Sequence, residues 1–259
     1  LQDSDVQKKE VSFKGYKDCE EFIKQNIRCP LYGTVVNFGD TLNLLPPGAP
    51  SLQGMKVLRA GLQLGTLKKN RFEPSHALAL ALMSNLRPGD ELLSPVGKPY
   101  DTLEEVIGIR DSKGSLMEYG ISYTQVNLLD DGTFDYEGIK NAINEKTKLV
   151  TIQRSKGYQT RPTFSVKQIG ELISFVKSIK PEVTVMVDNC YGEFVETIEP
   201  SDVGADMIVG SLIKNPGGGL APIGGYIAGT EECIENCAYR LTSPGLGKEV
   251  GASLGVMQS

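Results

Sequence analysis

From about residue 76 onward, blocks of apolar positions at helical spacing alternate with short, continuous apolar runs. Four blocks are typical of helices, at residues 76–83, 100–109, 135–144 and 165–179. The last of these is amphipathic, because Ile169, Leu172, Ile173 and Val176 recur at helical spacing and define one apolar face. Asp135 stands at the start of its block, where a side-chain oxygen can cap the first turn of a helix.

Short runs between these blocks are rich in apolar and β-branched residues and predict buried strands. They lie at residues 91–94, 121–128, 149–152, 183–187, 206–210 and 225–228. Strands that alternate with helices of roughly ten to fifteen residues indicate βαβ units. The predicted fold class is therefore α/β, with a mostly parallel sheet flanked by helices. In such sheets ligands bind beyond the carboxyl ends of the strands.

Residues 1–75 do not follow this order. The run Pro46-Pro47-Gly48-Ala49-Pro50 predicts a loop or linker, and residues 19–27 could form a helix. We therefore expect residues 1–75 to be a separate, unassigned segment and residues 76–259 to form the α/β domain.

Composition and charge narrow the class of protein. Of the 259 residues, 40% are hydrophobic and 23% are charged, which is typical of a soluble globular protein. The formal net charge is −5 and no cluster of Lys or Arg stands out, which argues against a nucleic-acid partner. No apolar run reaches the length of about 18 residues that a membrane span requires. The first residues do not resemble a signal peptide, so we expect a cytoplasmic protein, with an organellar stroma or matrix as the alternative.

The cysteine and histidine content argues against disulfides and metal. Five cysteines in a chain of this length favour reduced thiols over a disulfide framework. Cys233 and Cys237 lie four apart and would share one helix face, but His76 is the single histidine of the chain and lies far from them in sequence. We therefore predict no metal site.

An acid and a lysine follow two of the predicted strands, as a pyridoxal 5′-phosphate (PLP) site requires. Asp188 ends the run 183–187, and Lys214 follows the run 206–210 and precedes Pro216 and three glycines. A lysine at such a position can form a Schiff base with PLP, and an acid can keep the pyridine nitrogen protonated. Ser211 lies three residues before Lys214, where its short hydroxyl would suit a phosphate. The simpler interpretation is a solvated loop lysine, with Asp188 as a turn cap.

Two further side chains have both a functional and a structural interpretation. Tyr100 stands at a predicted helix start after Gly97-Lys98-Pro99, where its ring could stack on a flat cofactor or cover the edge of the core. His76 opens an apolar helix, and a lone histidine is usually structural.

Five segments together resemble the aluminium resistance family, which is also described as methionine gamma-lyase-like or cystathionine beta-lyase-like. They are residues 86–93, 97–108, 153–158, 187–194 and 214–219, and the resemblance covers about residues 75–255. That family belongs to the PLP-dependent proteins of fold type I. The resemblance implies that Lys214 is the Schiff-base lysine, that Asp188 pairs with the ring nitrogen, and that Ser211 and His76 lie at the phosphate. It also implies that Tyr100 lies beside the cofactor ring.

The resemblance implies a function and an assembly as well. The expected activity is PLP-dependent elimination, through Lys214, that breaks a carbon–sulfur bond in a sulfur-containing amino acid. The alternatives are an aminotransferase, or an inactive fragment that only folds or dimerises. The expected partners are a small amino-acid substrate and further copies of the chain, in a homodimer or homotetramer. The family continues into a smaller C-terminal domain, which we expect to be missing here.

Overall fold

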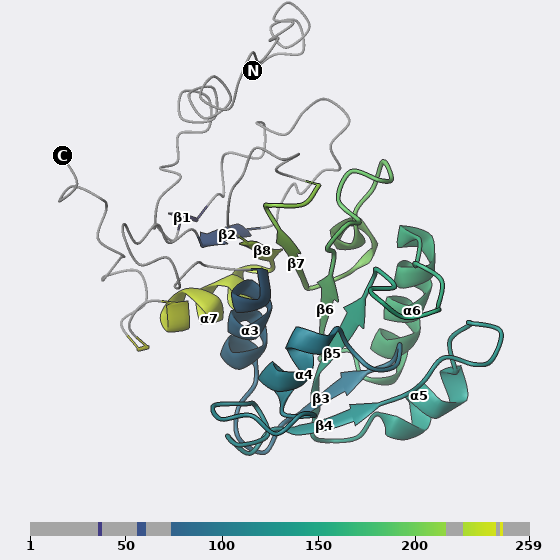
Figure 1. Cartoon of the computed structure of the whole chain (residues 1–259), viewed down its shortest axis with the longest axis horizontal. Helices are drawn as coiled ribbons and strands as arrows, with labels where there is room; N and C mark the ends of the chain where they lie inside the picture. The colour runs from purple at the N-terminus through teal and green to yellow at the C-terminus, as the bar shows by residue number, and fades with distance from the viewer. Residues whose placement is uncertain (1–35, 38–55, 61–73, 216–224, 242–243, 246–259) are drawn as a thin grey trace, which may run out of the picture.

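The computed structural model describes residues 36–37, 56–60, 74–215, 225–241 and 244–245 (Figure 1). Its strands are β1 (Val36–Asn37), β2 (Lys56–Ala60), β3 (Glu91–Ser94), β4 (Ser122–Gln125), β5 (Thr147–Gln153), β6 (Thr184–Asp188), β7 (Met207–Ser211) and β8 (Gly225–Gly229). Its helices are α3 (Pro74–Asn85), α4 (Asp101–Ile107), α5 (Tyr136–Ala142), α6 (Val166–Ile179) and α7 (Glu231–Leu241), with a 3₁₀ turn, η2 (Pro200–Val203).

These strands form one sheet in the order β1-β2-β8-β7-β6-β5-β3-β4. The neighbours from β7 to β4 pair in parallel, whereas β8 is antiparallel to both β7 and β2, and β1 is antiparallel to β2. The parallel core joins strands that are connected through helices, as the sequence predicts. The α/β fold class with a mostly parallel sheet is therefore confirmed.

Helices cover both faces of the sheet, which explains why its central strands are apolar throughout. One face packs against α3, α4 and α7, and the other packs against α5 and α6 (Figure 1). Along β7, Met207 and Val209 point into the first core and Ile208 into the second, as the two-residue period of a strand requires. Strands that are buried on both faces have continuous apolar runs.

Local signals explain where the helices begin and end. Ser165 and Gln168 form a capping box at the start of α6, and the Asp135 carboxylate accepts a hydrogen bond from Gly138 N (2.8 Å) at the start of α5. Helix α4 ends two residues before the predicted boundary because Gly108 adopts a left-handed backbone with φ 101°. A Cβ at this glycine would lie only 2.8 Å from Ser115 Oγ, so the chain turns out of the helix here.

The edges of the sheet depart most from the predicted strands. The run 121–128 predicts a strand of eight residues, but β4 is shorter because it lies at the sheet edge with exposed ends. Upstream of residue 75, β2 pairs along its length with β8, so residues 56–60 belong to the same sheet. The helix expected at residues 19–27 lies outside the described residues. None of the helices in the described ranges combines the length and apolar character needed to cross a bilayer.

Candidate PLP site

Three polar side chains gather at the carboxyl edge of the parallel strands. Gln153 ends β5, Asp188 ends β6 and Ser211 ends β7, and Gln153 is the register partner of Asp188. Lys214 follows in the turn after β7, where its backbone N–H contacts Ser211 O (3.4 Å). The structure therefore brings Asp188, Ser211 and Lys214 to one edge, where ligands of such sheets bind.

The Asp188 carboxyl is buried, and the groups around it shift its pKa in the direction opposite to burial. Burial raises its pKa, whereas the donors of Cys190 and the charges of Lys214 and Arg161 oppose that rise. The Cys190 backbone N–H donates to Asp188 Oδ1 (3.1 Å). Arg161 is itself partly buried, which lowers the pKa of its guanidinium to about 10. A cation beside Asp188, such as a protonated ring nitrogen, would stabilise the ionised carboxylate further.

Ser211 has an unusual environment for a serine. Its side chain is buried, and its hydroxyl has no hydrogen-bond partner among the described residues. A buried hydroxyl without a partner costs free energy, so native proteins rarely retain one without a reason. A phosphate oxygen would satisfy this hydroxyl, so the residue fits the predicted phosphate contact.

Lys214 lies against an aromatic ring that the sequence did not single out. Its ammonium Nζ is 4.1 Å from the ring centroid of Tyr191, which is a cation–π contact. Tyr191 has a left-handed backbone (φ 66°), which is rare for a residue with a large side chain. The sequence run Asp188 to Phe194 pointed to this loop, but nothing in it predicts the backbone conformation that turns the ring toward Lys214.

Tyr100 lies immediately before α4 and is part of a group of tyrosines. Its backbone N–H donates to Gln153 Oε1 (2.7 Å), which fixes it beside the end of β5. Its ring stacks on Tyr158 at 5.7 Å between centroids. A hydrogen bond to Tyr158, together with burial, raises the pKa of Tyr100 to about 12, and the charge of Tyr191 acts in the same direction. Tyr191 contacts Lys214 and also acts on Tyr100, so Tyr100 lies at the same edge of the sheet as Lys214.

His76 lies in the first turn of α3. Ser75 Oγ is 3.2 Å from Thr102 Oγ1, so the start of α3 lies beside the start of α4. The side chain of His76 is exposed, and partial burial lowers the pKa of its imidazole. His76 therefore lies beside the start of α4, which Tyr100 directly precedes. The three glycines after Pro216, which the sequence associates with Lys214, lie outside the described residues.

Glu193 is a buried carboxyl that the sequence did not identify. Tyr226 Oη donates to its Oε1 (3.0 Å), and Asn215 Nδ2 donates to its backbone oxygen (3.0 Å). Burial, as the largest cause, raises the pKa of Glu193 to about 7. Gly210 is required beneath it, because a Cβ there would lie 2.3 Å from Glu193 Oε1. Glu193 thus joins the loop after β6 to the Lys214 turn and to β8.

The raised pKa of Glu193 predicts a pH dependence of stability. The pKa of Glu193 is higher in the folded chain than in the unfolded chain. Its contribution to the free energy of unfolding is therefore complete below about pH 4.5 and is lost as the pH rises to about 7. At roughly 1.4 kcal/mol per pKa unit, the loss is about 3 kcal/mol. We expect Glu193→Gln to remove this pH-dependent loss of stability, because glutamine keeps the size of the side chain and its acceptor oxygen. Denaturant unfolding of both proteins from pH 4 to 8 measures the difference, and a constant difference across that range would contradict the assignment.

A pocket of about 310 Å³ lies elsewhere on the molecule. It is lined by Leu86 and Pro88, which precede β3, and by Ile121, which precedes β4. It is therefore at the amino edge of the strands, opposite Asp188 and Ser211.

Within the described ranges, no three His, Cys, Asp or Glu side chains are grouped so that they could hold a metal ion.

Comparison with known proteins decides the family. The family model described as methionine gamma-lyase matches residues 64–259. The chain belongs to this family. It is a PLP-dependent family, and several solved structures similar to this chain carry the description of aluminium resistance. A second model, the first C-terminal domain of RsmF rRNA methyltransferase, matches only residues 21–82, which is too small a share to show a family.

Individual relatives support the same assignment. Uncharacterized protein YnbB of Bacillus subtilis is 52% identical over 213 residues, covering 82% of this chain and 51% of its own. A solved structure from Listeria monocytogenes, described as a candidate cystathionine beta-lyase involved in aluminium resistance, matches with TM-score 0.72 and 42% identity over 98% of this chain and 64% of its own. A carbon–sulfur lyase involved in aluminium resistance from Clostridium novyi NT matches with TM-score 0.69 and 38% identity, over 98% and 62%. This methionine gamma-lyase family member thus spans about half the length of the curated relative.

Proposed function

We propose that this chain carries the PLP site of a carbon–sulfur lyase that acts on a sulfur-containing amino acid. The observation that carries the proposal is the convergence of Lys214, the buried Asp188 carboxyl and the unpartnered Ser211 hydroxyl at one strand edge. In a member of a PLP-dependent family, these three groups match the three ends of the cofactor. When bound, PLP supplies an electron sink for the bonds at the substrate Cα.

Lys214 has two tasks in this proposal. Its amine would hold the cofactor through a bond to the aldehyde carbon. Once exchanged for the substrate amine, it would serve as the general base for the Cα proton. Its position in a short turn after β7, against the Tyr191 ring, limits where the amine can move.

Asp188 and Ser211 hold the two ends of the cofactor. An ionised Asp188 keeps the ring nitrogen protonated, since the two opposite charges stabilise each other in a buried site. The Ser211 hydroxyl donates to the phosphate. The first turn of α3 offers backbone N–H groups to the same phosphate, although Pro74 has none. His76, in the first turn of α3, would also lie at the phosphate. Tyr100 would lie beside the cofactor ring.

The reaction class is supported by relatives rather than by geometry. The Clostridium novyi protein is described as a carbon–sulfur lyase. A histidinol-phosphate aminotransferase of Staphylococcus carnosus is also 30% identical, over 46% of this chain. Transamination would use the same Lys214 and Asp188, so the two activities are distinguished by their reaction products. We expect the PLP-loaded chain to release a 2-oxo acid and a free thiol from cystathionine. Transfer of the amino group to a 2-oxo acid acceptor, without thiol release, would contradict the lyase assignment.

Ser211→Ala should change stability and cofactor affinity in opposite directions. Without PLP, removing a buried hydroxyl that lacks a partner should raise the free energy of unfolding by about 1 kcal/mol. With PLP, loss of a hydrogen bond to a charged phosphate should weaken binding by roughly tenfold or more. Denaturant unfolding of the cofactor-free chain and a fluorescence titration with PLP measure the two effects. Unchanged affinity would remove Ser211 from the phosphate site.

We also propose that the chain assembles as a homodimer or homotetramer. The loop after β6 exposes large apolar side chains at Tyr191, Phe194, Val195 and Ile198, which supports an interface near the site. Size-exclusion chromatography with light scattering tests this, and a monomer at micromolar concentration would contradict it.

A further inference from the structure

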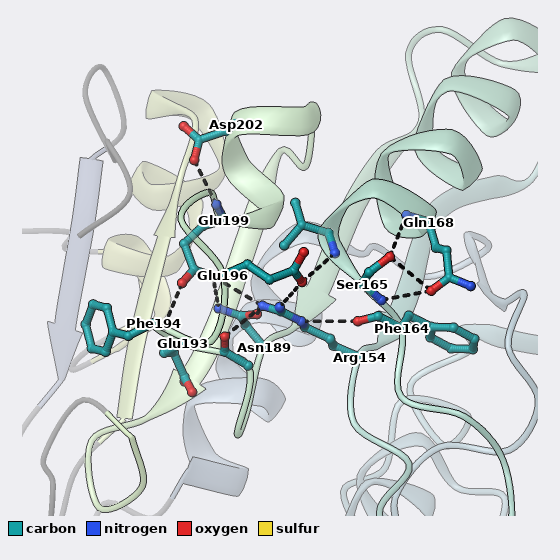
Figure 2. Close-up of polar contacts among 12 residues, drawn as sticks. Arg154, Phe164, Ser165, Gln168, Asn189, Glu193, Phe194, Glu196, Glu199 and Asp202 are labelled. Atoms are coloured by element: carbon teal, nitrogen blue, oxygen red, sulfur yellow. Dashed lines mark hydrogen bonds and ion pairs between the residues drawn. The ribbon is translucent and has the colours of Figure 1, made fainter. Parts of the chain in front are cut away.

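Arg154 is one of the largest fully buried side chains of the protein, with only 2% of its surface exposed. It follows the last residue of β5, and all three of its guanidinium nitrogens have partners (Figure 2). Nη1 donates to Asn189 Oδ1 (2.9 Å), Gly192 O (2.9 Å) and Glu199 Oε2 (3.4 Å). Nη2 donates to Glu196 Oε1 (2.6 Å), and Nε donates to Phe164 O (3.4 Å). Four of these five acceptors belong to the loop that follows β6.

The contacts of Arg154 join that loop to its neighbours. Its backbone N–H donates to Asp188 O (3.0 Å), which links the ends of β5 and β6. Glu196 Oε1 also accepts from Val166 N (2.8 Å) at the start of α6. Glu199 accepts from Phe194 N (2.9 Å) and from Asn189 Nδ2 (2.8 Å). We call Arg154, Glu196 and Glu199 the clamp.

The clamp holds a loop whose backbone is strained. Tyr191 and Phe194 both have left-handed backbones, with φ values of 66° and 63°. Gly192, between them, must be a glycine, because a Cβ there would lie 2.5 Å from Arg154 Cδ and 2.6 Å from Nη1. Such conformations persist only where surrounding contacts determine them, and they concentrate at functional sites.

The strained loop delivers one side chain to the candidate site. Tyr191 lies between Asn189 and Gly192, both of which bind Arg154, and its ring meets the Lys214 ammonium at 4.1 Å. With 60% of its surface exposed, Tyr191 is not fixed by core packing. The backbone on either side of it, held by the clamp, must therefore set the position of its ring.

We propose that the clamp is a positioning unit, in which Arg154 acts through the loop backbone to hold the Tyr191 ring against the Lys214 amine. Its relevance to cofactor chemistry rests on the proposed function, whereas the contact itself does not. A clamp that served only folding would change stability and leave the surroundings of Lys214 unaltered in molecules that remain folded.

The labelling rate of Lys214 distinguishes these two cases. The chain without PLP is treated briefly with formaldehyde and cyanoborohydride, and the methylation of each lysine is followed by mass spectrometry. The exposed Lys113 is the internal reference. Tyr191→Asn removes the ring while tolerating the left-handed backbone. Since the ring face covers and attracts the amine, we expect Lys214 to react roughly two- to fivefold faster in this variant.

Clamp variants should produce the same change by a different route. We expect Arg154→Lys to accelerate the labelling of Lys214 to a similar extent, and to add nothing when it is combined with Tyr191→Asn. If Arg154→Lys does not fold, Glu196→Ala replaces it, because Glu196 is 34% exposed and the buried Arg154 keeps Glu199 as a charged partner. Glu171→Ala, in the exposed pair with Lys167, is the matched control and should leave Lys214 unchanged.

Two results would overturn the proposal: an unchanged labelling rate in a folded clamp variant, or effects of the clamp and of Tyr191 that simply multiply in the double variant. Because the measurement uses no PLP, its failure would leave the proposed function standing. Failure of PLP to attach at Lys214 would likewise leave the clamp result intact.

Discussion

Lys214→Ala is expected to abolish covalent attachment of PLP to this chain. Lys214 is the lysine that follows β7 in the same turn as Ser211 and beside the buried Asp188, so its amine is placed at the cofactor aldehyde. Without an amine at this position no covalent bond to the aldehyde can form there, and the base for the Cα proton is lost too. Turnover should therefore fall below detection.

Visible absorption of the chain after dialysis against PLP measures this attachment. Lys156→Ala is the matched control, since Lys156 lies in the loop after β5 at the same edge of the sheet. We expect the control to keep the absorption of the unaltered chain. Retention of that absorption by Lys214→Ala would show that another amine holds the cofactor.

Asp188→Asn is expected to leave PLP bound while lowering turnover by roughly 10²–10³-fold, the usual cost of losing one preorganised electrostatic contact. The amide keeps the shape of the side chain and can still accept from Cys190 N, but it has no charge to keep the ring nitrogen protonated. Asp188→Asn would therefore leave the ring nitrogen unprotonated, and the negative charge at Cα would be less stabilised.

A second aspartate offers a control for this substitution. Asp206 lies at the opposite edge, where its carboxylate accepts from Val185 N (2.7 Å) and pairs with Lys177 (2.7 Å). Asp206→Asn should reduce the free energy of unfolding and leave turnover per folded molecule unaltered. Equal turnover in Asp188→Asn and the unaltered chain would give Asp188 a structural role, as a turn cap.

Local signals in the sequence predict much of this fold because they act over a few residues. The capping box at Ser165 and Gln168 marks the start of α6, and continuous apolar runs identify the strands buried on both faces, β5, β6 and β7. The pairing of β2 with β8 was not predicted, because it joins segments that lie more than 150 residues apart and depends on tertiary contacts.

The sequence likewise predicts some residues of the candidate site and misses others. Asp188, Ser211 and Lys214 were predicted because each follows a strand that the apolar pattern identifies, and the parallel sheet brings their strand ends together. Tyr191, Glu193 and Arg154 were missed. Their importance depends on a left-handed backbone, a raised pKa and a buried set of hydrogen bonds, none of which has a signature in sequence. The roles in cofactor binding and catalysis stay predictions for all five residues: Lys214, Asp188, Ser211, Tyr100 and His76. The domain division, the homo-oligomer and the cytoplasmic location also stay predictions.

Borohydride reduction of the PLP-treated chain, followed by peptide mapping, tests the central claim most directly. Reduction makes the bond between a lysine and PLP permanent, so the labelled residue can be read from the mass of its peptide. We predict one pyridoxyl label per chain, on Lys214. A label on Lys156 or Lys248 in place of Lys214, or no label at any lysine, would contradict the account of this site.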